Sequence, residues 1–488
     1  MTTSVNLRKI LHRKAWEMAT PTIAATTNGG FITGDKDGIM PQNDCVYMVN
    51  GASSIYNYNL DQDAWLQLPN SGITGAYAAG SCGEFRTIGM LGGSLENTAT
   101  AGTTTTLTTN RTVTRDIYGS KIRVVSGTGV GYEGTVSSVR VGANSVITVT
   151  PANGVAFDAT TTFRIWSGSL WFFNAGTTAV GFSVWDRATN TWTAKSVTNL
   201  PTSFGTGGQL IATGSYEGVL ETGTSTGSNT TSTLIQTTKN WQTNQWANAQ
   251  VRITAGTGVG QIRAIVSGTS NTLTISGTWT VTPDATSVYA IEGCDDYMYL
   301  VGNNAVTLYR YVVSTNTWST LTPSVARAGA LGAGGTADWI HSPPEWVSLV
   351  DANSLSSVTG IALFKQPGRY VYSFRGAGSN TLDVYDISLN TWMSAIAYGN
   401  QNETFNTGSS SCDSDGNIYI IKEATGRVFK FNIDRHIIEP FTTNVYPQST
   451  AVTMDSVFIR NYIDGGTKVP FLYLLRHSGT EFIRMMIF

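Results

Sequence analysis

Short stretches of alternating apolar and polar residues recur along the chain, and four of them end in a turn followed by tryptophan. Each stretch contains an apolar strand, a turn bearing Gly or Asn, a second aromatic-rich strand and a polar turn. The pattern predicts repeated meanders of short antiparallel strands. The stretches are "CVYMVNGASSIYNYNLDQDAW" ending at Trp65, "SLWFFNAGTTAVGFSVWDRATNTW" at Trp192, "YMYLVGNNAVTLYRYVVSTNTW" at Trp318 and "RYVYSFRGAGSNTLDVYDISLNTW" at Trp392.

The turn before each tryptophan carries Asn, or Asp in the first copy. Asn and Asp suit such a turn because the side chain bonds nearby backbone and the residue tolerates left-handed φ. The tryptophan then opens the next strand with a large apolar surface to bury. We interpret Trp65, Trp192, Trp318 and Trp392 as structural wedges.

Two later segments, starting at Asn417 and Phe471, keep the rhythm without the tryptophan. Six units of roughly 50 residues predict an all-β protein folded as a six-bladed β-propeller. The last unit lacks an outer strand, which would leave a sheet edge open. The segment 23–33 is the expected donor of that strand, and it would close the ring.

The N-terminal segment "SVNLRKILHRKAWEMATP" predicts a short helix, capped by Ser4 and stopped by Pro21. The helix either packs on the propeller or docks onto a neighbouring subunit. An irregular loop from Gly334 carries two further tryptophans that suggest a contact surface. The candidate interface residues are Leu7, Ile10, Leu11, Trp16, Trp339 and Trp346.

Two insertions match each other. "GTGVG" from Gly127 returns 129 residues later at Gly256, and Asp158-Ala-Thr returns at Asp284. A unit with its insert was therefore duplicated, and both inserts are expected to share one β-fold. No helix follows the glycines, so they predict a tight turn rather than a nucleotide site. The expected organisation is an N-terminal arm at 1–22, propeller segments at 23–95, 168–219 and 294–488, and inserted β-domains at 96–167 and 220–293.

An aromatic residue stands seven positions before each repeat tryptophan, and a decayed Gly pair precedes it. In this the chain resembles the kelch and galactose-oxidase-like β-propellers, which implies the propeller fold. The second insert, through its "KNW", "QW", "VRI" and "PDATSVY" blocks, is similar to a module of tailed-bacteriophage virion proteins. That resemblance implies a virion location, with assembly in the host cytoplasm.

The composition excludes several classes of function. Charged residues are 13% and the formal net charge is −2, which is unlike a protein that binds nucleic acid through a basic surface. No apolar run is long enough to span a membrane. The four cysteines are widely spaced, which favours reduced buried thiols.

The candidate chemistry is sparse. Four scattered histidines offer no metal-binding spacing, and the acids in "CDSDGNIY" and "GDKDG" are typical of turns rather than of calcium loops. No cofactor is expected. A sialidase-type site would need arginines to converge on the propeller axis, and the candidates are Arg310, Arg369, Arg375, Arg427 and Arg460.

These observations favour a non-enzymatic structural component of a tailed-phage virion, in a tail or nozzle first and as capsid decoration second. Its expected partners are other virion proteins, and copies of the chain would form a ring-shaped homo-oligomer. The alternative is a propeller that binds or cleaves host-surface glycans.

Overall fold

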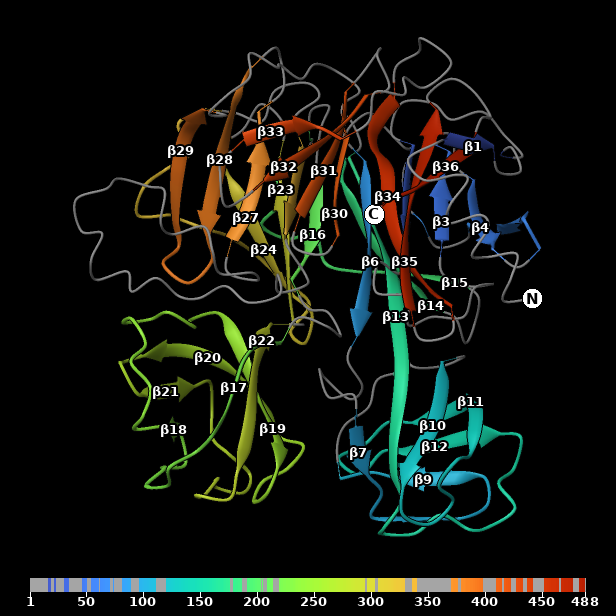
Figure 1. The fold of residues 1–488 in the computed structure, drawn as a ribbon, viewed down its shortest axis with the longest axis vertical. Coiled ribbons are helices and arrows are strands. Elements are labelled where there is room, and N and C mark those ends of the chain that lie inside the picture. Colours follow the sequence, from blue (N-terminus) through green and yellow to red (C-terminus); the bar gives the residue numbers. More distant parts are fainter. Residues whose placement is uncertain are drawn as a thin grey trace.

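We analysed a computed structural model of the chain. It describes residues 16–18, 22, 30–34, 46–50, 54–60, 62–70, 73, 81–88, 96–110, 120–175, 179–186, 191–202, 204, 209–213, 219–294, 296–302, 306–329, 336–339, 370–375, 379–397, 410–414, 417–422, 427–432, 437–441, 452–464, 467–476 and 482–487. Over these residues the protein is all-β, without a helix, and its arrangement is propeller-like (Figure 1).

Five four-stranded antiparallel sheets and a four-stranded part of a ten-stranded sheet make up the larger part of the described chain, and we number these six units, called sheets below, I to VI in chain order. Sheet I contains β2 (Phe31–Gly34), β3 (Val46–Val49), β4 (Ile55–Asn59) and β5 (Ala64–Leu68). Sheet II contains β6 (Cys82–Ile88), β13 (Thr162–Asn174), β14 (Gly181–Asp186) and β15 (Thr191–Ala194). Sheet III contains β16 (Gln209–Ala212), β23 (Tyr297–Val301), β24 (Leu308–Val312) and β25 (Thr317–Thr320).

The remaining three sheets follow the same plan, except that the last takes a strand from the N-terminal segment. Sheet IV contains β26 (Thr336–Trp339), β27 (Tyr370–Phe374), β28 (Thr381–Asp386) and β29 (Thr391–Ala397). Sheet V contains β30 (Ser410–Ser414), β31 (Asn417–Lys422), β32 (Arg427–Asn432) and β33 (Ile437–Pro440). Sheet VI contains β34 (Val452–Asp464), β35 (Thr467–Arg476), β36 (Phe482–Met486) and β1 (Trp16–Met18).

The sheets form a closed ring. Their first strands are neighbours in the cyclic order β2, β6, β16, β26, β30, β34 and back to β2. Aromatic and aliphatic side chains fill the space between consecutive sheets. Such contacts include Tyr47 on Phe85 (I–II), Phe182 on Trp318 (II–III), Tyr299 on Tyr385 (III–IV), Tyr372 on Phe431 (IV–V) and Tyr58 on Phe482 (I–VI).

The strand that completes sheet VI is not the predicted one. β1 pairs with β36, with Trp16 opposite Met485, while Phe31–Gly34 forms the first strand of sheet I. The donor predicted at 23–33 is therefore wrong, and so is a helix that extends through Trp16 to Met18. An open sheet edge offers unpaired backbone groups, and this demand overrides the helix propensity of three residues. The rest of the predicted helix lies outside the described residues.

Two smaller β-domains leave the ring at equivalent places, between the first and second strands of sheets II and III. Figure 1 shows both below the ring. Inserted domain 1 comprises β7 (Glu96–Thr98), β8 (Ala101–Gly102), β9 (Thr106–Thr108), β10 (Lys121–Ser126), β11 (Glu133–Arg140), β12 (Val146–Thr150) and the first part of β13. Inserted domain 2 comprises β17 (Val219–Thr224), β18 (Thr233–Ile235), β19 (Ala249–Ala255), β20 (Ile262–Gly268), β21 (Thr272–Ile275) and β22 (Val288–Gly293).

The shared fold of the two inserts is confirmed. Domain 1 has the strand order β7-β13-β10-β11-β12-β9, with β8 added at the edge, and domain 2 has β17-β22-β19-β20-β21-β18. Each position in the first order corresponds to the same position in the second. Each domain also has its own apolar core, separate from those of the ring.

Candidate functional site

The repeated turn has one geometry wherever it is described. Tyr311 donates its hydroxyl to Asn316 Oδ1 over 2.7 Å, and its ring lies 5.0 Å from that of Trp318, its cross-strand partner. Asn316 has a φ of 52°, the left-handed conformation that Asn tolerates. The same arrangement recurs in two other copies, at Tyr58, Asp63 and Trp65 and at Tyr385, Asn390 and Trp392.

These turns also join neighbouring sheets. Asn316 Oδ1 accepts a hydrogen bond from the backbone of Ser196, which follows sheet II, and Asn390 donates to the carbonyl of Thr322, which follows sheet III. Trp318 is 1% exposed. The repeated turn therefore stabilises its own hairpin and the contact of its sheet with the preceding sheet, which is a structural role.

Trp192 and Trp65 depart from the other two repeat tryptophans. Trp192 faces Trp185 across the hairpin, because Trp185 stands where the other copies have Tyr. Its indole nitrogen donates to the carbonyl of Pro69 in the loop after sheet I. Trp65 is only half-buried, although its ring lies 5.0 Å from that of Phe482 in sheet VI.

The glycine loops of the inserted domains are turns, as predicted. Gly127 and Gly256 both have a φ of 75°. Thr128 and Thr257, at the second position of each loop, donate to Asp158 at 2.7 Å and to Asp284 at 2.8 Å. Hydrogen bonds from Thr160 and Thr286, followed by these contacts from the loop threonines, hold the pKa of both carboxyls below the usual value. A strand follows each loop, so neither loop presents a helix end to a phosphate.

The two domains are joined to the ring differently. β13 runs without interruption from domain 1, where it pairs with β7, into sheet II, where it pairs with β6. In domain 2, β22 ends at Gly293 and β23 begins at Tyr297, in another sheet. Asn248 of domain 2 bridges that joint: its Nδ2 donates to the carbonyl of Ile387 over 2.9 Å, and Arg310 Nη1 donates to its Oδ1 over 3.1 Å.

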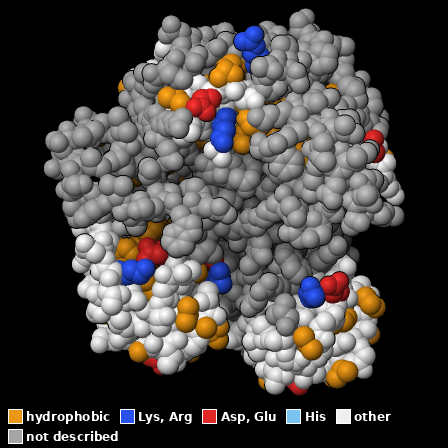
Figure 2. Space-filling model, viewed as in Figure 1, with side chains coloured by type: hydrophobic (Ala, Val, Ile, Leu, Met, Phe, Trp, Pro, Cys, Tyr) orange, Lys and Arg blue, Asp and Glu red, His pale blue; other side chains and the backbone are white. Residues whose placement is uncertain are grey.

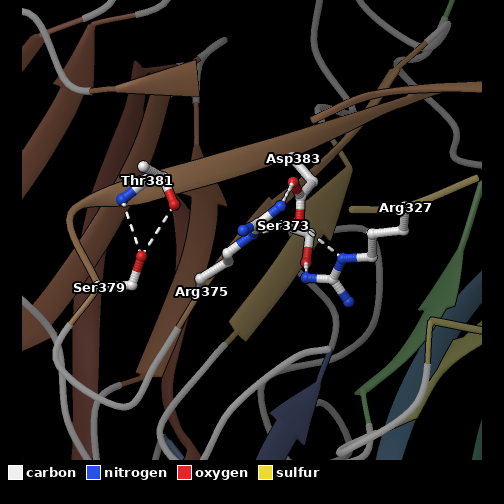
Figure 3. Close-up of polar contacts among 6 residues, drawn as sticks. All are labelled: Arg327, Ser373, Arg375, Ser379, Thr381 and Asp383. Carbon is white, nitrogen blue, oxygen red and sulfur yellow. Dashed lines mark hydrogen bonds and ion pairs between the residues drawn. The ribbon is translucent and has the colours of Figure 1, made fainter. Parts of the chain in front are cut away.

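A second polar cluster is centred on sheet IV and includes Arg327 from the segment between β25 and β26 (Figure 3). Asp383, fully buried, accepts bonds from Arg327 Nε at 2.6 Å and from Arg375 Nε and Nη2 at 2.9 and 2.6 Å. Arg327 also donates to Ser373 and lies over the ring of Trp392. Desolvation lowers the pKa of Arg327, whereas the hydrogen bonds to Asp383 raise that of Arg375. Two cations share one carboxylate, and Arg327 Nη1 is buried without an acceptor.

The arginines considered for a sialidase-type site do not meet where they are described. Arg310 contacts domain 2, Arg375 is paired with Asp383 in sheet IV, and Arg427 is the exposed first residue of β32 in sheet V. Arg369 lies outside the described residues, and of Arg460 only the backbone is described.

The candidate interface residues fall mostly on undescribed parts of the chain. Leu7, Ile10, Leu11 and Trp346 lie outside the described residues, as do all four histidines. Trp16 belongs to β1. Trp339 was predicted on an irregular loop, but it ends β26 and pairs with Val371, because the first strand of sheet IV is recruited from this segment.

Among the described residues, no cluster of His, Cys, Asp and Glu could hold a metal ion. No helix in that part of the chain is long and apolar enough to cross a membrane. Cys82 and Cys294 are buried, and neither belongs to a disulfide in the described part of the chain.

Asn248 and the Arg327–Asp383 pair are not among the residues that the sequence predicted for a site. An acid between apolar residues in "TLDVYD" was the available signal for Asp383, since a strand buried on both faces must pair a carboxylate. Nothing local distinguishes Asn248, because its partners are 62 and 139 residues away.

No protein-family model matches the chain, and no curated protein matches it. Among solved structures it is similar to the phage phi92 endosialidase (9% identity, TM-score 0.30, covering 97% of this chain and 69% of that one). It is also similar to a luciferin-regenerating enzyme (7%, 0.34, 97% and 98%) and to a chain of the mitotic checkpoint complex (7%, 0.35, 98% and 93%). Similarities this weak carry no argument about activity.

Proposed function

We propose that the chain is a six-bladed β-propeller, with sheets I to VI as its blades, that serves as a non-enzymatic structural component of a tailed-phage virion. A tail or nozzle position is the first choice and capsid decoration the second. The observation that carries the proposal is the duplication of one small β-domain beside the ring. The resemblance of the second insert to phage virion modules supports the same assignment.

The exposed surfaces of the inserts suit protein contacts. Val130 and Val155 of domain 1 are 66% and 57% exposed, and Val259 and Val281 of domain 2 are 51% and 50% exposed. Val130 and Val259 occupy the same place in the two glycine loops. Figure 2 shows apolar side chains on the outer surface of both domains. Two copies of one apolar loop favour contact with a repeated neighbour, such as further virion proteins or other copies of this chain.

Mass spectrometry of purified virions from the phage that encodes the chain tests the proposal. We expect the protein at a fixed copy number and expect Val130→Asp/Val259→Asp, which alters exposed sites only, to fold but not to be incorporated. A matched variant, Thr100→Asp, changes an exposed residue away from the glycine loops. Absence of the protein from particles would refute the virion role.

Glycan recognition is the second candidate, and the Arg327–Arg375–Asp383 cluster is the observation that favours it. Two guanidinium groups on one carboxylate leave a net positive charge, and Arg375, whose side chain is 17% exposed, is the group of the three that an acidic sugar would reach. Binding to an array of sialylated and neutral glycans, compared between the native chain and Arg375→Ala, tests it. Selective binding of acidic glycans that Arg375→Ala abolishes would favour this function, and equal signals on all glycans would exclude it.

A further inference from the structure

The two inserted domains differ in how firmly their joints to the ring are built. In domain 1, β13 carries backbone hydrogen bonds across the joint, and Ser167 at the joint still pairs with Ile88 of β6. Rotating domain 1 against the ring would break this ladder. Domain 2 lacks such a ladder strand, since β22 and β23 belong to different sheets.

Asn248 is fixed to domain 2 and reaches the ring with its side chain. Its backbone amide donates to the carbonyl of Ile265 over 2.8 Å, within the domain. Its φ of 65° places it in the left-handed conformation, at the end of the turn that precedes β19. The side-chain amide then contacts two sheets at once, Arg310 of sheet III and Ile387 after β28 of sheet IV.

The joint leaves buried donors unsatisfied. A cavity of about 10 Å³, room for about one water molecule, is lined by Trp246, Asn248, Cys294 and Ser388, among others. The indole nitrogen of Trp246 and Nε of Arg310 are buried without an acceptor. Burying a hydrogen-bond donor without a partner costs free energy. When the joint opens, water reaches these donors, and this offsets part of the free energy by which the closed contact stabilises the joint.

We propose that Asn248 is a latch that holds inserted domain 2 against the ring, and that releasing it lets domain 2 pivot while domain 1 stays fixed. Release of the latch breaks the two hydrogen bonds that the Asn248 side chain makes. The neutral bond to Ile387 is of a strength that changes an equilibrium by about ten-fold or less, and the bond from the charged Arg310 by about ten- to a hundred-fold. The latched and open orientations are therefore close enough in free energy for a partner bound to domain 2 to select between them.

Two native cysteines supply an internal readout. Cys294 lines the joint and is 2% exposed, while Cys82 is fully buried inside the ring, in sheet II. Opening of the joint exposes Cys294 alone, whereas unfolding of the ring exposes both. Alkylation by N-ethylmaleimide of the full chain, followed residue by residue by mass spectrometry, measures the two rates under native conditions.

The key variant is Asn248→Gly, which keeps the left-handed backbone accessible and removes both side-chain bonds. We expect the alkylation rate of Cys294 to rise by about ten- to a hundred-fold with that of Cys82 unchanged. Asn248→Asp retains the acceptor for Arg310 but loses the donor to the carbonyl of Ile387, so the Cys294 rate should rise less than in Asn248→Gly. Asn271→Gly is the matched control, because the side-chain oxygen of this asparagine accepts from its neighbour Thr272, within domain 2.

Arg310→Met approaches the latch from the ring and leaves domain 2 intact. A rise in the Cys294 rate in both Asn248→Gly and Arg310→Met supports the latch, even if Asn248→Gly also loosens domain 2. An unchanged Cys294 rate in Arg310→Met, or an equal rise for Cys82 in both variants, overturns it.

Discussion

Inserted domains 1 and 2 share one strand order and two of its irregularities. Register shifts follow Val124 and Val136 in the first domain and Ile253 and Ile265, at the corresponding positions, in the second. Their joints differ, because one shares a strand with the ring and the other bridges the gap with a side chain. Duplication thus preserved what the domain needs to fold and left its attachment free to change.

The cores of the two domains differ as well. Domain 2 buries Trp241, Trp246 and Trp279, whereas the core of domain 1 is built from Phe157, Phe163 and smaller aliphatic residues. Domain 2 also buries an ion pair: Glu292 accepts from Arg252 Nε over 3.0 Å. Arg123, which aligns with Arg252, pairs instead with the exposed Glu133.

Substituting the first loop glycine should have the largest effect, and it should be equal in the two domains. A Cβ at Gly127 would lie 1.9 Å from the carbonyl oxygen of Thr160, and one at Gly256 would lie 2.0 Å from that of Thr286. With the left-handed φ added, Gly127→Ala and Gly256→Ala should each cost about 5 kcal/mol. Gly131→Ala is the control, because its Cβ meets nothing within 4 Å.

Hydrogen exchange resolved by domain measures this loss. Gly131→Ala should cost about 1–2 kcal/mol, from backbone strain alone. A loss in one domain but not in the other would mean that the two turns are not equivalent.

Truncating Trp279, in the core of domain 2, should lower the stability of that domain alone. Trp279 is 4% exposed and donates its indole hydrogen to the carbonyl of Thr233. Trp279→Ala should therefore cost about 3–5 kcal/mol, confined to amides of domain 2. Trp318→Ala is its counterpart in the ring, with the same expected loss at the seam between sheets II and III. If Trp318→Ala cost less than about 1 kcal/mol, the burial of the repeat tryptophans would contribute little to stability.

What the sequence predicts well is local. The hairpins follow from alternation, and the turn before Trp318 follows from an asparagine at the position that needs a left-handed φ. The match of the two inserts also needs only the sequence, since the paired glycines and aspartates stand at corresponding positions.

What the sequence misses depends on distant partners. Trp16–Met18 has helical propensity, but strand pairing with β36 decides its conformation. Asn248 gains its role only when Arg310 and Ile387 come together from two sheets. Neither outcome can be read from neighbouring residues.

Removing the arginine of each domain sharpens the comparison of their ion pairs. Arg252→Met leaves the buried Glu292 without its counter-charge and should cost about 3 kcal/mol. Arg123→Met, in the exposed pair of domain 1, should change stability by about 0–1 kcal/mol. Chemical denaturation followed by domain-resolved exchange checks both values, and equal losses would contradict the difference in burial.

The Glu292 pair should also respond to pH. Burial raises the pKa of Glu292, and Arg252 partly opposes the shift. A carboxyl whose folded pKa is raised contributes most stability below its unfolded value of about 4.3, and loses it as the pH rises through the folded pKa. The cost of Arg252→Met should therefore grow between pH 4 and neutrality.

The smallest expected effect is an acid-induced loss that the two domains share. Hydrogen bonds from Thr160 and Thr128 lower the pKa of Asp158, and those from Thr286 and Thr257 lower that of Asp284. A folded pKa below the unfolded one means that the stability is fully present above about pH 4 and disappears as the pH falls through the folded pKa. Below pH 4 both domains should therefore lose protection in parallel. Asp158→Asn should abolish the acid step in domain 1 only, and Asp284→Asn in domain 2 only, because an amide does not titrate. Loss of the step in both domains from one substitution would show that the domains are coupled, contrary to their separate cores.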